Sequence, residues 1–226
     1  MRAPRFPISK ELAVIVAALL LLLHPGEALG VLATGHQADH ALLVLGDHEA
    51  GRLILAHEIL LAELERQVPK MTLVTQNVDG LHQFAGSSGV IELHGNIMRS
   101  KCSVTHRPIS REWLVDQEGS PPPSPYVRHG LARPDVVWFG EMLPQEAIDR
   151  ATAIAHRSDF CFSIGTTSLV HPAAGLPVIA QRNGAQLVEI NPTGTPISAQ
   201  ADQCLRGTAT AALTAIRDQL RAALAG

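Results

Sequence analysis

The chain has 226 residues, of which 46% are hydrophobic, which is enough material for one domain with a sizeable core. Its formal net charge is −3 and it contains no run of lysine and arginine, so the composition does not indicate a nucleic-acid-binding protein. Its cysteines, Cys102, Cys161 and Cys204, are odd in number and widely spaced. This excludes a disulfide framework and a zinc site made of cysteines alone, and a reducing cytosol fits best.

Residues 1–53 form an atypical N-terminal segment. Basic residues precede an unbroken apolar run at residues 12–23, and the small-residue pattern Ala28-Leu29-Gly30 follows, which is typical of a signal peptide. The run is too short for an ordinary membrane span of about 20 residues. Export or membrane association through residues 1–30 stays open beside a buried or aberrant segment. The later residues favour a cytoplasmic protein.

The remaining chain, residues 54–226, predicts strands that alternate with helices. An amphipathic helix is expected at residues 54–67, with Leu55, Ile59, Ala62 and Leu64 on one face, and a strand at residues 71–74. Further strands are expected at residues 136–139, 160–164 and 186–190, and helices at residues 145–156, 172–183 and 209–224. Apolar strands without polar alternation are typical of a covered parallel sheet. We therefore predict an α/β fold: a Rossmann-like, mostly parallel sheet covered by helices.

Residues 101–133 interrupt this alternation. They contain Pro108, the run at residues 121–123, Pro125 and Gly130. Such punctuation indicates a loop-rich segment. We expect a small irregular insertion subdomain rather than packed regular structure.

Polar residues follow the ends of several predicted strands. Gln76, Asn77 and Asp79 follow residues 73–75, the sequence Gly-Thr-Thr-Ser at residues 165–168 follows the strand before it, and Asn191 follows residues 188–190. Turns and helix caps account for any one of these stretches. In a parallel sheet, however, ligands sit at the carboxyl ends of the strands. All these ends together indicate one binding crevice.

The stretch Thr75-Gln76-Asn77-Val78-Asp79-Gly80-Leu81-His82, followed by Ala85-Gly86 and by Glu92-Leu93-His94-Gly95, resembles the signature of the sirtuins, the NAD-dependent protein deacylases. The sequences at residues 136–141, 165–174 and 189–191 are similar to later sirtuin motifs. The resemblance covers residues 55–220, in family order and spacing.

This resemblance implies that NAD is the cofactor and that acylated-lysine proteins or peptides are the substrates, with nicotinamide and O-acyl-ADP-ribose as products. His94 is then the general base, which suits an imidazole whose ordinary pKa is about 6.5. Asp79 is expected to bind the nicotinamide carboxamide, and Gln76 and Asn77 to organise the ribose and nearby water. The resemblance assigns the cofactor phosphate and ribose contacts to Gly165, Thr166, Thr167, Ser168 and Asn191. It assigns strand-like pairing with the peptide to Val137, Trp138, Phe139 and Gly140.

The insertion departs from the family pattern, which usually has two cysteine pairs for zinc. Here Cys102 is followed only by His106, and no second pair occurs through Arg133. One thiolate and scattered histidines do not close a tetrahedral site, so we expect neither zinc nor any other metal. Packing of Trp113 and Tyr126 is expected to stabilise the subdomain instead, with Cys102 as a plain buried or idle thiol.

The front of the chain departs as well, because residues 1–53 lack the Gly-Ala-Gly-x-Ser loop that binds the cofactor diphosphate. Either this is a divergent member that lost the loop, or a shifted reading frame or wrong start precedes genuine sirtuin sequence. Losing several charge-assisted hydrogen bonds weakens NAD binding strongly. A catalytically impaired or truncated homologue that acts as a binding protein is therefore the alternative function.

Two other classes of protein fit less well. A Rossmann dehydrogenase is disfavoured because no Gly-x-Gly-x-x-Gly pattern follows a strand. A metal site at His36, His40 and His48 is disfavoured as well. Only His36 and His40 have the spacing to share a helix face, and no third ligand follows at a defined spacing, so a solvated helix is the better interpretation.

Overall fold

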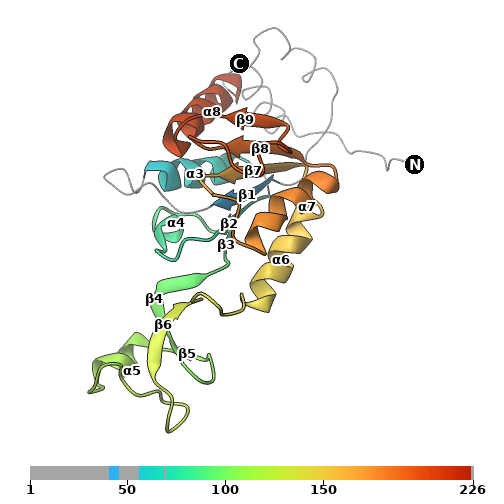
Figure 1. The fold of residues 1–226 in the computed structure, drawn as a ribbon. Coiled ribbons are helices and arrows are strands. Elements are labelled where there is room, and N and C mark those ends of the chain that lie inside the picture. Colours follow the sequence, from blue (N-terminus) through green and yellow to red (C-terminus); the bar gives the residue numbers. More distant parts are fainter. Residues whose placement is uncertain (1–40, 46–55, 69, 225–226) are drawn as a thin grey trace.

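The fold is organised around a six-stranded sheet in which every strand runs parallel to its neighbours. The computed structural model describes residues 41–45, 56–68 and 70–224 (Figure 1). The strand order is β3-β2-β1-β7-β8-β9. The strands are β1 (Ala41–Leu45), β2 (Met71–Thr75), β3 (Val90–Glu92), β7 (Phe160–Ile164), β8 (Gln186–Ile190) and β9 (Gln203–Leu205). The predicted α/β fold with a parallel sheet is thereby confirmed.

The sequence located β2, β7 and β8 to within one residue, but it predicted no strand at β1. This strand lies between β2 and β7, with Leu45 level with Thr75 on one side and with Ile164 on the other. The apolar run at residues 12–23 and the disfavoured metal site at His36, His40 and His48 lie outside the described residues. Among the helices that the structure describes, none is both long enough and apolar enough to cross a membrane.

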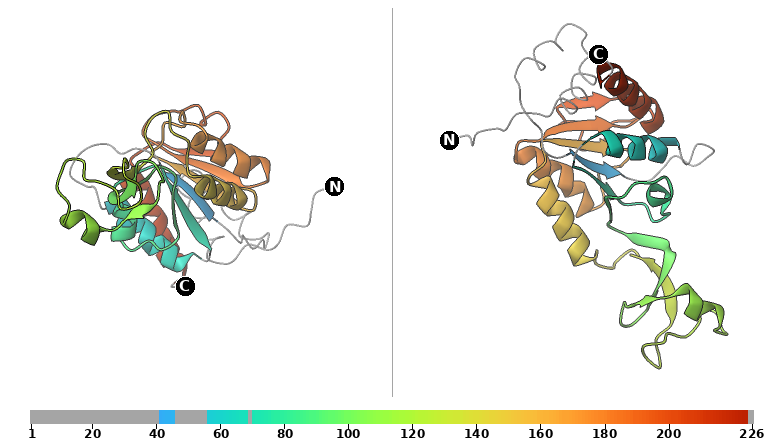
Figure 2. Two further views of the ribbon diagram at one scale, coloured as in Figure 1. Left: turned by 90° about the horizontal axis from the view of Figure 1, so that it is seen from below. Right: turned by 180° about the vertical axis from the view of Figure 1, so that it is seen from behind.

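Helices cover both faces of the sheet (Figure 2). On one face lie α3 (Ala56–Gln67) and α8 (Ala209–Leu224), which contact each other, and on the other lie α6 (Gln145–Ala155) and α7 (Leu176–Arg182). Because side chains alternate along a strand, Phe160 and Phe162 pack with α3 and α8, whereas Cys161 packs with α6 and α7. The two cores explain why these strands lack polar alternation.

The predicted apolar face of α3 was only partly right, because Ala62 and Leu64 are buried but Ile59 is not. Ile59 is 45% exposed, whereas Glu58, Leu60 and Leu61 are buried together with Ala62 and Leu64. The helix packs against both the sheet and α8, so more of its circumference is buried than a single apolar face, and the buried side includes Glu58. Glu58 tolerates burial because His57 Nε2 lies 2.9 Å from its Oε1. Burial is the largest single effect and raises the pKa of Glu58, but the contacts with His57, its own backbone and His82 together lower it.

The helix predicted at residues 172–183 is divided in the structure. A 3₁₀ turn, η1 (Ala173–Gly175), precedes α7, and Pro177 occupies the first turn of that helix. A short helix that was not predicted, α4 (Leu81–Phe84), follows β2.

The insertion is more regular than expected. With the residues on either side it forms a three-stranded antiparallel sheet, β5-β4-β6, made of β4 (Gly95–Cys102), β5 (Pro108–Ile109) and β6 (Ala132–Val136), with the helix α5 (Arg111–Val115) beside it. The subdomain therefore extends beyond the predicted residues 101–133 at both ends. This subdomain projects from the main body (Figure 1). Its small core joins Cys102, Ile109 and Ala132 to Leu114, Tyr126 and Val127. Tyr126 thus packs as predicted, whereas Trp113 is 40% exposed and its Nε1 donates to the Pro123 carbonyl at 3.5 Å.

The strand predicted at residues 136–139 was also wrong. Strand β6 ends at Val136, and it pairs with β4 rather than with the main sheet. Beyond it, Gly140 adopts a positive φ of 88° and Glu141 N–H donates to the Trp138 carbonyl at 2.9 Å. The apolar residues that suggested a strand therefore form an exposed turn, which a local pattern does not distinguish from a strand end.

Candidate functional site

Two segments that are distant in sequence meet at the carboxyl ends of β2 and β7. These ends lie at one level of the sheet, on either side of β1. Gln76 Nε2 donates to Thr166 Oγ1 at 3.3 Å, and Asn191 Nδ2 donates to the Thr166 carbonyl at 2.8 Å. The structure thus brings together the polar residues after β2, β7 and β8, at the position where parallel sheets bind ligands.

His94 lies beside this cluster, between β3 and β4. Its Nδ1 is 3.0 Å from the carbonyl oxygen of Gln76. A carbonyl only accepts hydrogen bonds, so Nδ1 carries a proton, and in the neutral form of the ring the lone pair lies at Nε2. Leu93 N–H donates to the Thr75 carbonyl at 3.0 Å and fixes the backbone just before His94. The ring is therefore oriented as a proton acceptor.

The loop after β2 is fixed by hydrogen bonds to its own side chains and to β4. Asn77 N–H donates to Thr75 Oγ1 at 3.0 Å, and Asp79 Oδ1 accepts from Leu81 N–H at 3.0 Å. Ile97 N–H donates to the Val78 carbonyl at 2.7 Å. Asn77 is buried, whereas Asp79 is partly exposed. Asp79 thus both starts α4 and leaves an oxygen for a ligand.

The loop after β7 is bent by two residues with positive φ, Gly165 at 62° and Ser168 at 55°. Ser168 N–H donates to Thr166 Oγ1 at 3.2 Å, and Gly165 N–H donates to the Ile190 carbonyl at 2.9 Å. Thr167 is exposed. The buried Ser168 hydroxyl has no hydrogen-bond partner within the part of the chain that the structure describes. Buried hydroxyls are seldom left unpaired, so this one is available to a ligand.

Glu189, which was not among the site residues predicted from the sequence, organises the loop after β8. Only 1% of Glu189 is exposed, yet it accepts hydrogen bonds from Ser198 Oγ at 2.5 Å, Arg206 Nη1 at 2.6 Å and the Thr195 hydroxyl. Burial raises the pKa of Glu189, but these partners outweigh burial and lower it. A charged residue inside an apolar strand was the available sequence signal. Through these contacts Glu189 fixes the loop that begins at Asn191.

The predicted peptide-pairing residues lie on the other side of His94. Val137 N–H donates to the His94 carbonyl at 2.9 Å. Trp138 is 54% exposed, and Phe139 is fully exposed. The segment Val137–Gly140 therefore starts at the histidine and presents backbone and aromatic groups to solvent.

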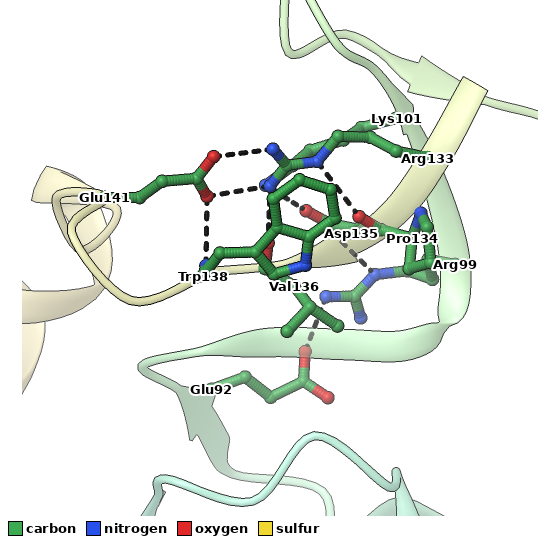
Figure 3. Close-up of polar contacts among 9 residues, drawn as sticks. All are labelled: Glu92, Arg99, Lys101, Arg133, Pro134, Asp135, Val136, Trp138 and Glu141. Atoms are coloured by element: carbon green, nitrogen blue, oxygen red, sulfur yellow. Dashed lines mark hydrogen bonds and ion pairs between the residues drawn. The ribbon is translucent and has the colours of Figure 1, made fainter. Parts of the chain in front are cut away.

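A chain of charged residues connects the main sheet to the subdomain (Figure 3). Glu92, at the end of β3, accepts from Asn96 Nδ2 and from Arg99 Nη2, both at 2.6 Å. Arg99 Nε reaches Asp135 at 3.3 Å, and Lys101 Nζ lies 3.2 Å from the other oxygen of Asp135. These contacts orient β4 and β6 around His94.

No group of three histidine, cysteine or acidic side chains suited to a metal occurs in the described ranges of the chain. Cys102 is fully buried, as predicted, and accepts a hydrogen bond from Thr105 N–H at 3.4 Å. Burial raises the pKa of its thiol, but hydrogen bonds from Ser124 and Thr105 outweigh burial and lower the pKa to about 6. The Cys102 thiol is therefore expected to lose its proton at lower pH than an ordinary cysteine.

Comparisons with solved structures agree with this geometry. The chain superimposes with a TM-score of 0.72 and 25% identity on Sir2Tm bound to a propionylated peptide, over 87% of this chain and 98% of that one. A Sir2 complex with a p53 peptide and NAD+ gives a TM-score of 0.70 and 25% identity, over 80% and 93% of the two chains. The fold is thus shared with Sir2 proteins over most of its length.

Comparisons of sequence agree as well. The chain is 43% identical over 165 residues to the NAD-dependent protein deacylase of Aquifex aeolicus, covering 73% of this chain and 68% of the relative. It is 45% identical over 151 residues to a protein of that name from Thermus thermophilus, covering 65% and 58%. The chain thus spans 58% to 68% of the length of these relatives.

The Sir2 family pattern matches residues 50–172, a range that runs from before α3 to just before the 3₁₀ turn that follows β7. This match covers more than half of the chain and includes His94, the loop after β2 and the segment Val137–Gly140. Sequence, fold and the convergence of the strand ends lead to one conclusion. The chain belongs to the Sir2 family.

Proposed function

We propose that this protein is an NAD-dependent protein deacylase, a transferase that moves the acyl group of an acylated lysine to ADP-ribose and releases nicotinamide. The observation that carries this proposal is His94. Its Nδ1–H is fixed by the Gln76 carbonyl, its Nε2 is left as an acceptor, and its own carbonyl is bonded to Val137. One residue thus joins a predicted cofactor loop to a predicted substrate segment.

The residues after β2, β7 and β8 fit NAD. Gly165 allows close approach of a ligand to the backbone, and the buried hydroxyl of Ser168 lacks a partner among the described residues. In this proposal Asp79 binds the nicotinamide carboxamide and the other residues bind ribose and phosphate groups: Gln76, Asn77, Gly165, Thr166, Thr167, Ser168 and Asn191. When bound, NAD supplies an electrophilic anomeric carbon and nicotinamide as the leaving group.

His94 acts on protons in this reaction. It accepts a ribose hydroxyl proton at Nε2, and the positive charge that the ring gains is stabilised by the Nδ1–H bond to the Gln76 carbonyl. Because that carbonyl belongs to the backbone after β2, the ring cannot turn without breaking the bond. A fixed ring orientation raises the fraction of encounters that are productive.

The substrate in this proposal is an extended acyl-lysine peptide that lies along Val137, Trp138, Phe139 and Gly140. Backbone pairing recognises a peptide without reading most of its side chains, which suits an enzyme with several protein substrates. We place the protein in the cytoplasm because its scattered cysteines suit a reducing compartment. No metal takes part in the proposed reaction.

Calorimetric titration of NAD into the purified chain, with an acyl-lysine peptide assay on the same sample, tests the proposal. We expect NAD binding together with nicotinamide release that disappears in His94→Ala. Asn77→Ala is expected to weaken NAD binding. A folded sample that binds no NAD would contradict the proposal and favour an impaired homologue that acts only as a binding protein.

A further inference from the structure

A single guanidinium fixes the turn that follows β6. Arg133 donates from Nη1 to Glu141 Oε1 at 2.5 Å and from Nη2 to Glu141 Oε2 at 2.7 Å, which makes a two-pronged ion pair (Figure 3). Its Nη2 also donates to the Val136 carbonyl at 2.7 Å. The Arg133 side chain is only 10% exposed. This geometry requires arginine, because a lysine ammonium cannot make the same parallel pair of bonds.

The same two residues fix Trp138. The Arg133 guanidinium carbon lies 4.1 Å from the centroid of the Trp138 ring, and Glu141 Oε2 accepts from Trp138 N–H at 3.0 Å. Arginine thus contacts the side chain of Trp138 while glutamate contacts its backbone. Since Trp138 is 54% exposed, much of its surface stays available to solvent or to a ligand.

Within the part of the chain that the structure describes, few other contacts stabilise this turn. Phe139 is fully exposed and Met142 is 87% exposed, so these neighbours add little packing. At its start the turn is bonded to His94 through Val137 N–H, and at its end Glu141 N–H donates to the Trp138 carbonyl. The ion pair is therefore the main contact that determines how Val137–Gly140 lies relative to His94.

We propose that Arg133, Glu141 and Trp138 form a positioning unit for the acyl-lysine peptide. The inference rests on the proposed function, because it takes Val137–Gly140 as the segment that pairs with substrate. Arg133 and Glu141 are positioning residues: they keep the backbone of the turn in a shape that an extended peptide can join. The unit sets the affinity for peptide and leaves the affinity for NAD unchanged, because its side chains contact neither the loop after β2 nor the loop after β7 among the described contacts.

The subdomain contains a matched control. The Arg107 guanidinium carbon lies 4.1 Å from the centroid of the Tyr126 ring, the same distance as in the Arg133–Trp138 pair. Tyr126 belongs to the small core and not to the turn. Arg107→Lys therefore reports on general loosening of the subdomain, whereas Arg133→Lys reports on the turn.

The experiment measures KM for an acetyl-lysine peptide, KM for NAD and kcat in the full chain and in Arg133→Lys, Glu141→Gln and Arg107→Lys. We expect Arg133→Lys and Glu141→Gln to raise the peptide KM about tenfold, with unchanged KM for NAD. Arg107→Lys is expected to leave the peptide KM unchanged. Trp138→Ala, at an exposed position, is expected to reproduce the higher peptide KM if Arg133→Lys does not fold.

Calorimetric titration of the same peptide separates the two hypotheses. If the unaltered chain binds and turns over peptide while Arg133→Lys, Glu141→Gln and Trp138→Ala match it, the positioning unit is refuted and the proposed function stands. If the unaltered chain binds NAD but not peptide, the proposed function fails and the unit fails with it. An equal rise in peptide KM in Arg107→Lys, or a lower kcat at constant peptide KM, would also refute the unit.

Discussion

The backbone N–H of Val137 donates to the carbonyl of His94 at 2.9 Å, which connects the proposed general base directly to the proposed peptide segment. The ring of the same histidine is bonded to the Gln76 carbonyl on the cofactor side. A shift of the peptide segment is therefore transmitted to the base through one backbone bond. Binding and proton transfer are expected to be sensitive to the same structural changes.

Replacement of His94 tests the base. His94→Ala is expected to lower the rate of nicotinamide release with peptide by at least about 100-fold, since general base catalysis contributes about 10²–10⁴. NAD binding is expected to persist, because the loops after β2 and β7 keep their own hydrogen bonds. The rate of nicotinamide release is measured from samples quenched at successive times, and NAD binding is measured by calorimetric titration. Equal loss of binding and rate would instead indicate a structural role for His94.

Gly95 is the residue whose replacement is expected to disturb the site most. Its φ is +79°, and an added Cβ would lie 2.0 Å from the Asp135 carbonyl oxygen. Gly95→Ala therefore combines backbone strain with a clash between β4 and β6. Gly184→Ala is the control, since its φ is +105° but nothing among the described atoms lies within 4 Å of the added Cβ. We expect the control to lose about 1 kcal/mol and Gly95→Ala to lose clearly more, measured by chemical unfolding.

The Arg133–Glu141 pair makes a prediction about acid stability. The hydrogen bonds from Arg133 lower the pKa of Glu141 to about 2, below the ordinary value of 4.5. A lowered carboxyl pKa stabilises the fold at pH values above 4.5, and this contribution disappears as the pH falls through about 2. The difference in unfolding free energy between the unaltered chain and Glu141→Gln is therefore expected to be constant above about pH 5 and to shrink below it. A constant difference down to pH 2 would contradict the ion pair.

Cys102 is expected to ionise near neutral pH. Its thiol pKa of about 6 predicts a rise in thiolate absorbance at 240 nm as the pH passes through 6, and Cys102→Ser is expected to remove that rise. Because the folded pKa lies below the ordinary value of 9.0, the contribution of Cys102 to stability is present above pH 9 and is lost as the pH falls through 6. Cys161→Ser is the control, because burial alone raises the pKa of the Cys161 thiol. A rise that persists in Cys102→Ser would refute the assignment.

Glu189 is expected to matter for both stability and NAD affinity. Glu189→Gln weakens charge-assisted hydrogen bonds to Arg206, Ser198 and Thr195, each of a kind that contributes about 1.5–3 kcal/mol. The loop that starts at Asn191 is then less ordered, so NAD binding is expected to weaken. Glu63→Gln is the control, because its exposed pair with Arg221, 3.2 Å apart, contributes about 0–1 kcal/mol. Thermal unfolding measures the stability of both variants and NAD titration measures their NAD affinity. Equal values for Glu189→Gln and Glu63→Gln would contradict this role of Glu189.

Local patterns in the sequence were sufficient to predict the helices and strands whose own residues show a clear apolar periodicity. The apolar strands β2, β7 and β8 and the helices α6 and α8 were predicted close to their observed bounds, because a period of 3.6 or a short apolar run between turn residues depends only on neighbours in the chain. The polar residues after the strands also indicated one crevice. Gln76, Thr166 and Asn191 do meet there.

Only the tertiary structure determined the features that depend on residues far apart in the sequence, namely strand pairing and the partners of the buried charges. Strand β1 is central only because β2 and β7 flank it, and β6 is a strand only because β4 pairs with it. Glu189 and Arg206 are 17 residues apart, and Cys102 and Ser124 lie on opposite sides of α5 in the sequence. The sequence by itself determined the family and the parallel sheet, and it singled out His94 as the proposed general base. Only the folded chain determined the partners of the buried charges, because a charge is stable in a core only beside a group that packing brings within hydrogen-bond distance.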